Sequence, residues 1–185
     1  MTAARPLPEY YPGGDSRQAS FLAPRPRWNP WQQLADEHPK YTVSDTHQMP
    51  SDRILGLLCV RAKKVWLCKS LSPHERRCTI AHELVHIERG PVPSNPEMAQ
   101  IEEDIVDEIA SRRLIAFEDL VATIRECPNG AISAWAYRLW VDQPMLEVRL
   151  RNLRQQELDA VDSIRIEAKH LTRSVALIHE IRATQ

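Results

Sequence analysis

The sequence lacks any long apolar segment, and this absence excludes a membrane-spanning helix. No run in the 185 residues approaches the roughly 20 consecutive apolar residues that a membrane-spanning helix requires. The N-terminus, residues 1–12, is rich in proline and polar residues and has no apolar core of a signal peptide. We therefore expect a cytoplasmic protein without a membrane partner, built as one domain or as one domain with a small appendage.

An excess of charge of one sign and closely spaced cysteines are missing as well. The formal net charge is −1, which gives no global argument for binding to nucleic acid or to an anionic membrane. The four cysteines, Cys59, Cys68, Cys78 and Cys127, contain no C-x-x-C pair and are too sparse for a disulfide scaffold. We expect reduced cysteines that pack as small core residues, and Cys78 ranks far behind other side chains as a metal ligand.

The order of the expected elements predicts an α+β fold that is mostly helical, with a small antiparallel sheet. Residues 1–29 are proline-rich, and we expect them to form a flexible arm without a core of its own. A short helix over residues 30–38 should precede two or three strands, among them 53–60 and 64–69, which a basic turn joins. Helical periodicity and end signals then predict helices at 73–89, 96–116, 118–126, 132–139, 143–153 and 156–183.

The His-Glu-x-x-His pattern at residues 82–86 is the most informative feature that is present. Four residues make about one helical turn, so His82 and His86 project from one face of a helix and can share a metal ion. Glu83 lies beside that face, where its carboxylate can take a proton from a water at the metal. Two imidazoles and one such carboxylate are what a zinc hydrolase needs before its third ligand. The alternative is a pair of surface histidines with a solvated glutamate.

The next predicted helix offers the third ligand. Glu103 and Asp107 are four residues apart, and their face continues through small and aliphatic side chains that can pack on the metal helix. Carboxylates on a core-facing stripe carry a desolvation cost, which a metal or another charged partner offsets. We therefore expect Glu103 to bind the metal and Asp107 to accept the ring N–H of a ligating histidine. Glu102 and Asp107 are rival ligands, and the whole acidic run is alternatively a solvated helix face.

Two segments resemble the ImmA/IrrE family of metallopeptidases: residues 71–86 and residues 103–115. In that family a glutamate opens the pattern Glu-x-x-Ala-Asn/Asp-x-Phe-Ala and completes the zinc site, and Glu103 and Asp107 match its two acidic or amide positions. Arg113 differs, because leucine is usual there. The resemblance implies a compact α+β peptidase domain with a small sheet beside the metal helix. Its implied role is to cleave, or otherwise relieve, a repressor encoded nearby in a phage, mobile element or stress operon.

Residues 134–154 have the pattern of a helix-turn-helix. The second of its helices carries three arginines that can enter a major groove: Arg149, Arg151 and Arg154. We favour instead a helical hairpin that packs on the rest of the protein or recognises a partner, because the net charge does not favour DNA. In that arrangement the arginines are exposed and the large apolar side chains are packed: Trp135, Trp140, Leu146 and Leu150.

The sequence thus predicts a zinc metallopeptidase domain over residues 30–117 and a helical C-terminal region over residues 118–185. The predicted function is that of a zinc-dependent endopeptidase acting on a protein partner, a transcriptional repressor, with Glu83 as the general base. The alternative is a zinc-containing regulatory protein that binds a repressor or DNA without cleaving peptide bonds. An intact Glu83 favours the enzyme, since a purely structural zinc site does not need it. No pattern in the sequence determines the oligomeric state.

Overall fold

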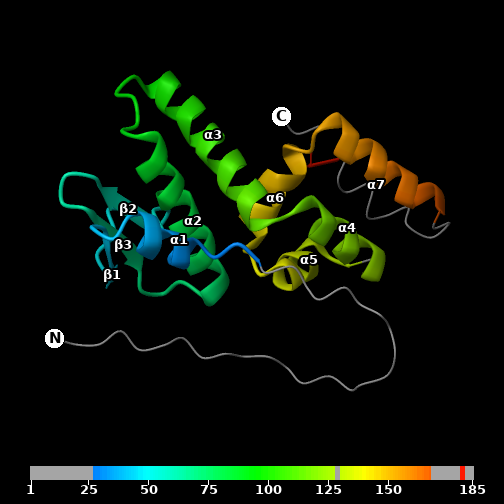
Figure 1. Ribbon diagram of the computed structural model, residues 1–185, viewed down its shortest axis with the longest axis horizontal. Helices are drawn as coiled ribbons and strands as arrows, with labels where there is room; N and C mark the ends of the chain where they lie inside the picture. The colour runs from blue at the N-terminus through cyan, green and yellow to red at the C-terminus, as the bar shows by residue number, and fades with distance from the viewer. Residues whose placement is uncertain (1–26, 128–129, 168–179, 182–185) are drawn as a thin grey trace, which may run out of the picture.

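The computed structural model describes residues 27–127, 130–167 and 180–181, and these form an α+β fold that is mostly helical, as expected (Figure 1). The predicted arm at residues 1–29 and the end of the last predicted helix lie mostly outside the described residues. The elements are α1 (Pro30–Glu37), β1 (Thr42–Thr46), β2 (Gly56–Cys59), β3 (Lys64–Cys68), α2 (Pro73–Arg89), α3 (Pro96–Leu114), α4 (Phe117–Glu126), α5 (Ile132–Leu139), α6 (Gln143–Arg151) and α7 (Gln155–Glu167).

The sheet has the strand order β1-β3-β2 and is mixed, so the expected antiparallel sheet is wrong for one of its two pairings. β2 and β3 form the predicted antiparallel hairpin, whereas β1 pairs in parallel with β3. A short turn forces neighbouring strands to run in opposite directions, but a strand joined through residues 47–55 has no such restriction. Along β3 the side chains alternate, with Val65 and Leu67 fully buried and Lys64 and Trp66 on the outer face.

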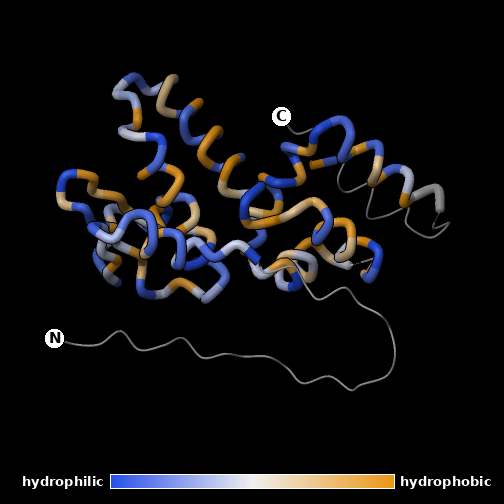
Figure 2. The backbone as a smooth tube through the Cα atoms, viewed as in Figure 1, coloured by the Kyte–Doolittle hydropathy of each residue, from blue (hydrophilic) through white to orange (hydrophobic). Residues whose placement is uncertain are grey.

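Helix α2 has well-defined ends, because capping residues stand at both of them. The helix lies between two hydrophobic cores. Ser72 and Glu75 make the predicted capping box, with the Ser72 backbone N–H donating to Glu75 at 2.7 Å, and Gly90 ends the helix at a φ of 102°. Ile80 and Leu84 pack with α1 and the sheet, while other residues of α2 pack with α3 to α7. Hydrophobic and hydrophilic positions alternate along α3 and α7 in Figure 2, as in helices that bury one side.

The C-terminal helices pack as expected in most positions but not in all. Trp135, Leu146 and Leu150 are fully buried, whereas Trp140 is 49% exposed at the end of α5, so its expected burial is wrong. Arg149 was expected to be exposed but is only 2% exposed. Its guanidinium donates to the carboxylate of Glu157 on α7 and to a backbone oxygen that ends α3, and this excludes it from a DNA surface.

The four cysteines are free thiols, and Cys78 is buried in the core while the other three are half-buried. The Cys78 sulfur accepts a hydrogen bond from the backbone N–H of Asp142 at 3.3 Å, and burial raises the pKa of its thiol. Cys78 therefore serves packing, as the sequence indicated. Within the described ranges, no helix combines the length and the apolar composition needed to cross a membrane.

Candidate metal centre

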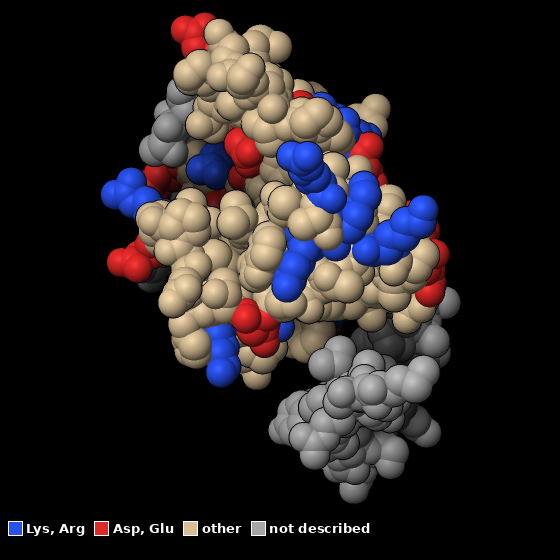
Figure 3. All heavy atoms as spheres, turned by 90° about the vertical axis from the view of Figure 1, so that its left-hand side faces the viewer, with Lys and Arg blue, Asp and Glu red and all other residues tan. Residues whose placement is uncertain are grey.

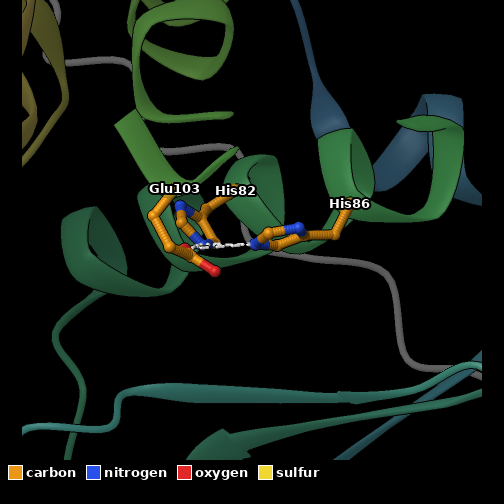
Figure 4. Close-up of side chains that lie close together, drawn as sticks. All are labelled: His82, His86 and Glu103. Carbon is orange, nitrogen blue, oxygen red and sulfur yellow. Dashed lines mark hydrogen bonds and ion pairs between the residues drawn. The ribbon is translucent and has the colours of Figure 1, made fainter. Parts of the chain in front are cut away.

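Helices α2 and α3 bring the three predicted metal ligands to one point (Figure 4). His82 and His86 lie one turn apart on α2, and their Nε2 atoms are 3.0 Å apart. An Oε2 atom of Glu103, from α3, lies 3.3 Å from the Nε2 atom of each histidine. Helical spacing places the two histidines together, and the packing of α2 against α3 brings the predicted ligand Glu103 to them.

The three ligand atoms fit a zinc ion. Zinc bonds of about 2.0–2.2 Å in a tetrahedral site place neighbouring ligand atoms roughly 3.3–3.6 Å apart. The observed separations of 3.0 and 3.3 Å come close to that geometry. Two imidazoles and one carboxylate also match the ligands of catalytic zinc sites, which keep a fourth position for water. The arrangement is therefore a candidate metal centre with three protein ligands, His82, His86 and Glu103.

The neighbouring acidic residues have separate partners, which distinguishes the ligand from its rivals. The carboxylate of Asp107 lies 2.8 Å from Nδ1 of His82, as expected for a residue that fixes the tautomer of a ligating histidine. Glu102 instead accepts a hydrogen bond of 2.8 Å from the guanidinium of Arg89. The equivalent Nδ1 atom of His86 is buried, and no described group forms a hydrogen bond with it. Asp107 thus orients His82, whereas Glu102 pairs with Arg89 and is not one of the three clustered ligands.

The electrostatics of the centre favour a positive charge where the ligands meet. Burial lowers the pKa of His82, but hydrogen bonds with Asp107 and Glu103 outweigh this effect and raise the pKa to about 10. Burial and the neighbouring His82 lower the pKa of His86. The hydrogen bond with His82 holds the pKa of Glu103 below its usual value. A charged His82 supplies that positive charge in the metal-free site, and a divalent cation supplies it when bound.

Glu83, the predicted base, lies beside the centre and is only 6% exposed. Burial raises the pKa of its carboxyl to about 7, and the nearby Glu103 adds to the shift. Gly56 on β2 allows the close approach, because a Cβ atom there would lie 2.5 Å from Oε1 of Glu83 and 2.5 Å from Cγ2 of Thr79. A glycine inside a strand pattern often marks such an approach, and this signal was present in the sequence.

A cavity of about 780 Å³ opens onto the metal centre. One wall is β2 with the residues before it, and the opposite wall comes from α2, α3 and the segment that begins α6. The C-terminal region contributes four side chains to this wall: Asp142, Pro144, Met145 and Val148. Sequence reasoning did not place these residues at the site, because segments about 60 residues away from the histidines carry no local signal of such contact.

A second group of potential ligands, Glu37, His38 and Glu88, lies on the far end of α1 and α2. Both carboxylates are already engaged there. Glu88 forms an ion pair of 2.7 Å with Arg113, and Glu37 accepts a hydrogen bond from Gln33 at 2.8 Å. The basic side chain at position 113, which departs from the resembled family, thus neutralises Glu88 in this group.

Comparisons with protein-family models, with curated proteins and with solved structures gave no match. The resemblance to the ImmA/IrrE family therefore remains a prediction from the motifs. The assignment of the candidate metal centre rests on the geometry of the chain itself.

Proposed function

We propose that this protein is a zinc-dependent endopeptidase that cleaves a protein partner, a transcriptional repressor. The observation that supports this proposal is the position of Glu83, a buried carboxylate beside three converging ligands at the floor of an open cavity. A structural zinc site is closed by four protein ligands and needs no additional base. The repressor as substrate follows from the resemblance of the two zinc helices to the ImmA/IrrE family.

Each residue of the centre has a distinct task in this reaction. When bound, zinc supplies a Lewis acid that polarises the peptide carbonyl and acidifies water. Glu83 takes the proton of the attacking water on its carboxylate and then delivers it to the leaving amine. Asp107 keeps the proton of His82 on Nδ1, so that Nε2 points to the ligand cluster. Burial around Glu83 excludes bulk water from this proton transfer.

The edge strand β2 supports an extended peptide as the substrate. In the described sheet β2 pairs with β3 on one side only, and residues 53–58 line the cavity. An exposed strand edge offers free N–H and C=O groups, and a peptide can bind there as an additional strand. Such binding would carry a scissile bond along the strand past Gly56, which lies against Glu83.

The test is the incubation of zinc-loaded protein with a repressor encoded beside it, followed by mass spectrometry of the fragments. We expect one or few defined cleavage sites, and a Glu83→Gln variant that keeps zinc but cleaves on the order of a hundredfold more slowly. Glu97→Gln, an exposed carboxylate at the start of α3, is the matched control and should cleave normally. A wild-type protein that binds zinc and the repressor without cleaving it would favour the regulatory alternative.

A further inference from the structure

Four basic side chains gather at one end of the sheet: Lys40, Arg61, Lys63 and Lys64. Lys40 precedes β1, Arg61 and Lys63 belong to the turn between β2 and β3, and Lys64 begins β3. The backbone N–H of Thr42 donates to the carbonyl oxygen of Lys63 at 2.9 Å, which holds the start of β1 against the turn. We call these four residues the basic sheet end.

The basic sheet end is not neutralised by the described part of the chain. None of its four side chains forms an ion pair with a described carboxylate, whereas many other basic residues do. Arg76 pairs with Asp45 at 2.7 Å, for example, and Arg113 pairs with Glu88 at 2.7 Å. Figure 3 shows Lys and Arg side chains close together on the side of the molecule where the sheet lies. A protein of net charge −1 thus has a local positive surface.

An aromatic ring adjoins these cations on the outer face of the sheet. Trp66 is half-buried, and the Lys64 Nζ atom lies 5.1 Å from the centre of its ring. Strand register places Leu57, which is 42% exposed, and Ser44 on either side of Trp66. The opposite face of the sheet packs against α1 and α2 through Val65 and its neighbours. The outer face is therefore partly apolar and bordered by positive charge.

We propose that this outer face and the basic sheet end bind single-stranded nucleic acid. Proteins that bind single strands combine cations that contact phosphates with aromatic rings on which bases stack. Here the cations are at the sheet end and the ring of Trp66 adjoins them. This surface differs from the arginine-bearing helix considered from sequence, in which Arg149 is buried. An acidic protein satisfies the cations but makes no particular use of the half-buried ring of Trp66 beside them, so nucleic acid fits better.

Fluorescence anisotropy with a labelled thymidine oligonucleotide of about 20 residues tests the proposal at about 50 mM salt. We expect the full chain to bind in the micromolar range. The triple variant Lys40→Gln, Arg61→Gln, Lys63→Gln should bind at least about tenfold more weakly. The slope of the logarithm of its binding constant against the logarithm of the salt concentration should be smaller in magnitude by about 2, or about 0.7 for each lost phosphate contact. A matched triple variant, Arg125→Gln, Arg151→Gln, Arg154→Gln, changes the charge equally and should bind like wild type.

Two further measurements separate the proposal from its rivals. Trp66→Leu keeps the apolar bulk and should weaken binding about tenfold through lost base stacking. Glu83→Gln should bind normally, because this surface is independent of the proposed peptidase reaction. The proposal is overturned if the oligonucleotide does not bind at low salt, or if both triple variants bind it equally weakly. It is also overturned if polyglutamate binds as tightly and Trp66→Leu has no effect, a result that would indicate an acidic protein partner.

Discussion

His82 and His86 face a common point because one helical turn separates them, whereas Glu103 reaches that point from a different helix. The acidic run on α3 offered three neighbouring carboxylates, and their surroundings distinguish them. Glu103 meets the two histidines, Asp107 meets Nδ1 of His82, and Glu102 forms an ion pair with Arg89. Each carboxylate thus has its own positive or hydrogen-bonding partners, as the cost of desolvating charged groups requires.

At the scale of single residues, this geometry predicts one zinc ion per chain. Metal analysis of protein purified without chelator should give close to one equivalent, and His82→Ala or Glu103→Ala should lose most of it, because a site with two protein ligands binds zinc weakly. Glu102→Ala is the matched control and should retain zinc, since its carboxylate binds Arg89. Full zinc in the Glu103→Ala variant would contradict the ligand assignment.

At the scale of elements, α2 is the part of the fold on which the site depends. Its two buried sides belong to different cores, one with α1 and the sheet and the other with the remaining helices. This arrangement fixes the rotation of α2 about its axis, so the histidines face α3 while Glu83 faces β2. The close contact between α2 and β2 is allowed by a residue without a side chain, Gly56.

Gly56→Ala tests the contact between the two elements. The added Cβ atom would lie 2.5 Å from both Glu83 and Thr79, so β2 or the carboxylate must move. We expect a loss of about 1–3 kcal/mol in the free energy of unfolding, from overpacking, and a strong loss of cleavage with zinc retained. Urea unfolding, the cleavage assay and metal analysis measure these three effects. Cys59→Ala, on the same strand but outside the cavity lining, should leave all three quantities near wild type, and equal effects of the two substitutions would argue against the contact.

At the scale of the whole molecule, a group of charges joins α7 to α3 and α6. Glu157 on α7 accepts hydrogen bonds from Arg149 on α6 and from Arg112 on α3, at 3.1 and 3.3 Å. Arg149 also donates to the backbone oxygen of Ile115 at 3.2 Å. Since Arg149 is almost fully buried, its charge is tolerated only because these acceptors surround it. The group fixes α6, whose first turn lines the cavity at the metal centre.

Acid should therefore weaken the attachment of α7. Burial alone raises the pKa of Glu157, but hydrogen bonds with Arg149 and with the Arg154 backbone outweigh this and lower the pKa to about 2. A lowered pKa in the folded state adds stability above the ordinary value of 4.5, and this contribution is lost as the pH falls from there towards 2. Glu157→Gln should cost about 2 kcal/mol near neutral pH, where it leaves Arg149 poorly paired.

Urea unfolding of wild type and Glu157→Gln at several pH values measures this effect. The difference in the free energy of unfolding should shrink as the solution is acidified below about pH 4. Asp159→Asn, an exposed carboxylate on the same helix, should show no such difference. If the difference in the free energy of unfolding between wild type and Glu157→Gln does not depend on pH, the ion pair of Glu157 with Arg149 does not have this role.

The sequence by itself determined the features that depend on neighbouring residues. The spacing of His82 and His86, the capping box at Ser72, the hairpin of β2 and β3 and the face shared by Glu103 and Asp107 all follow from helical or strand periodicity, which local backbone geometry controls. The first residues of most helices were also predictable for this reason.

Only the tertiary structure decided which distant segments meet. It brought Glu103, the expected ligand, to the two histidines, set β1 parallel to β3, buried Arg149 against Glu157 and placed Met145 in the wall of the cavity. These outcomes depend on how helices and strands far apart in the chain pack to bury apolar surface and to pair charges. No short window of sequence contains that information, because each contact depends on the arrangement of all the elements together.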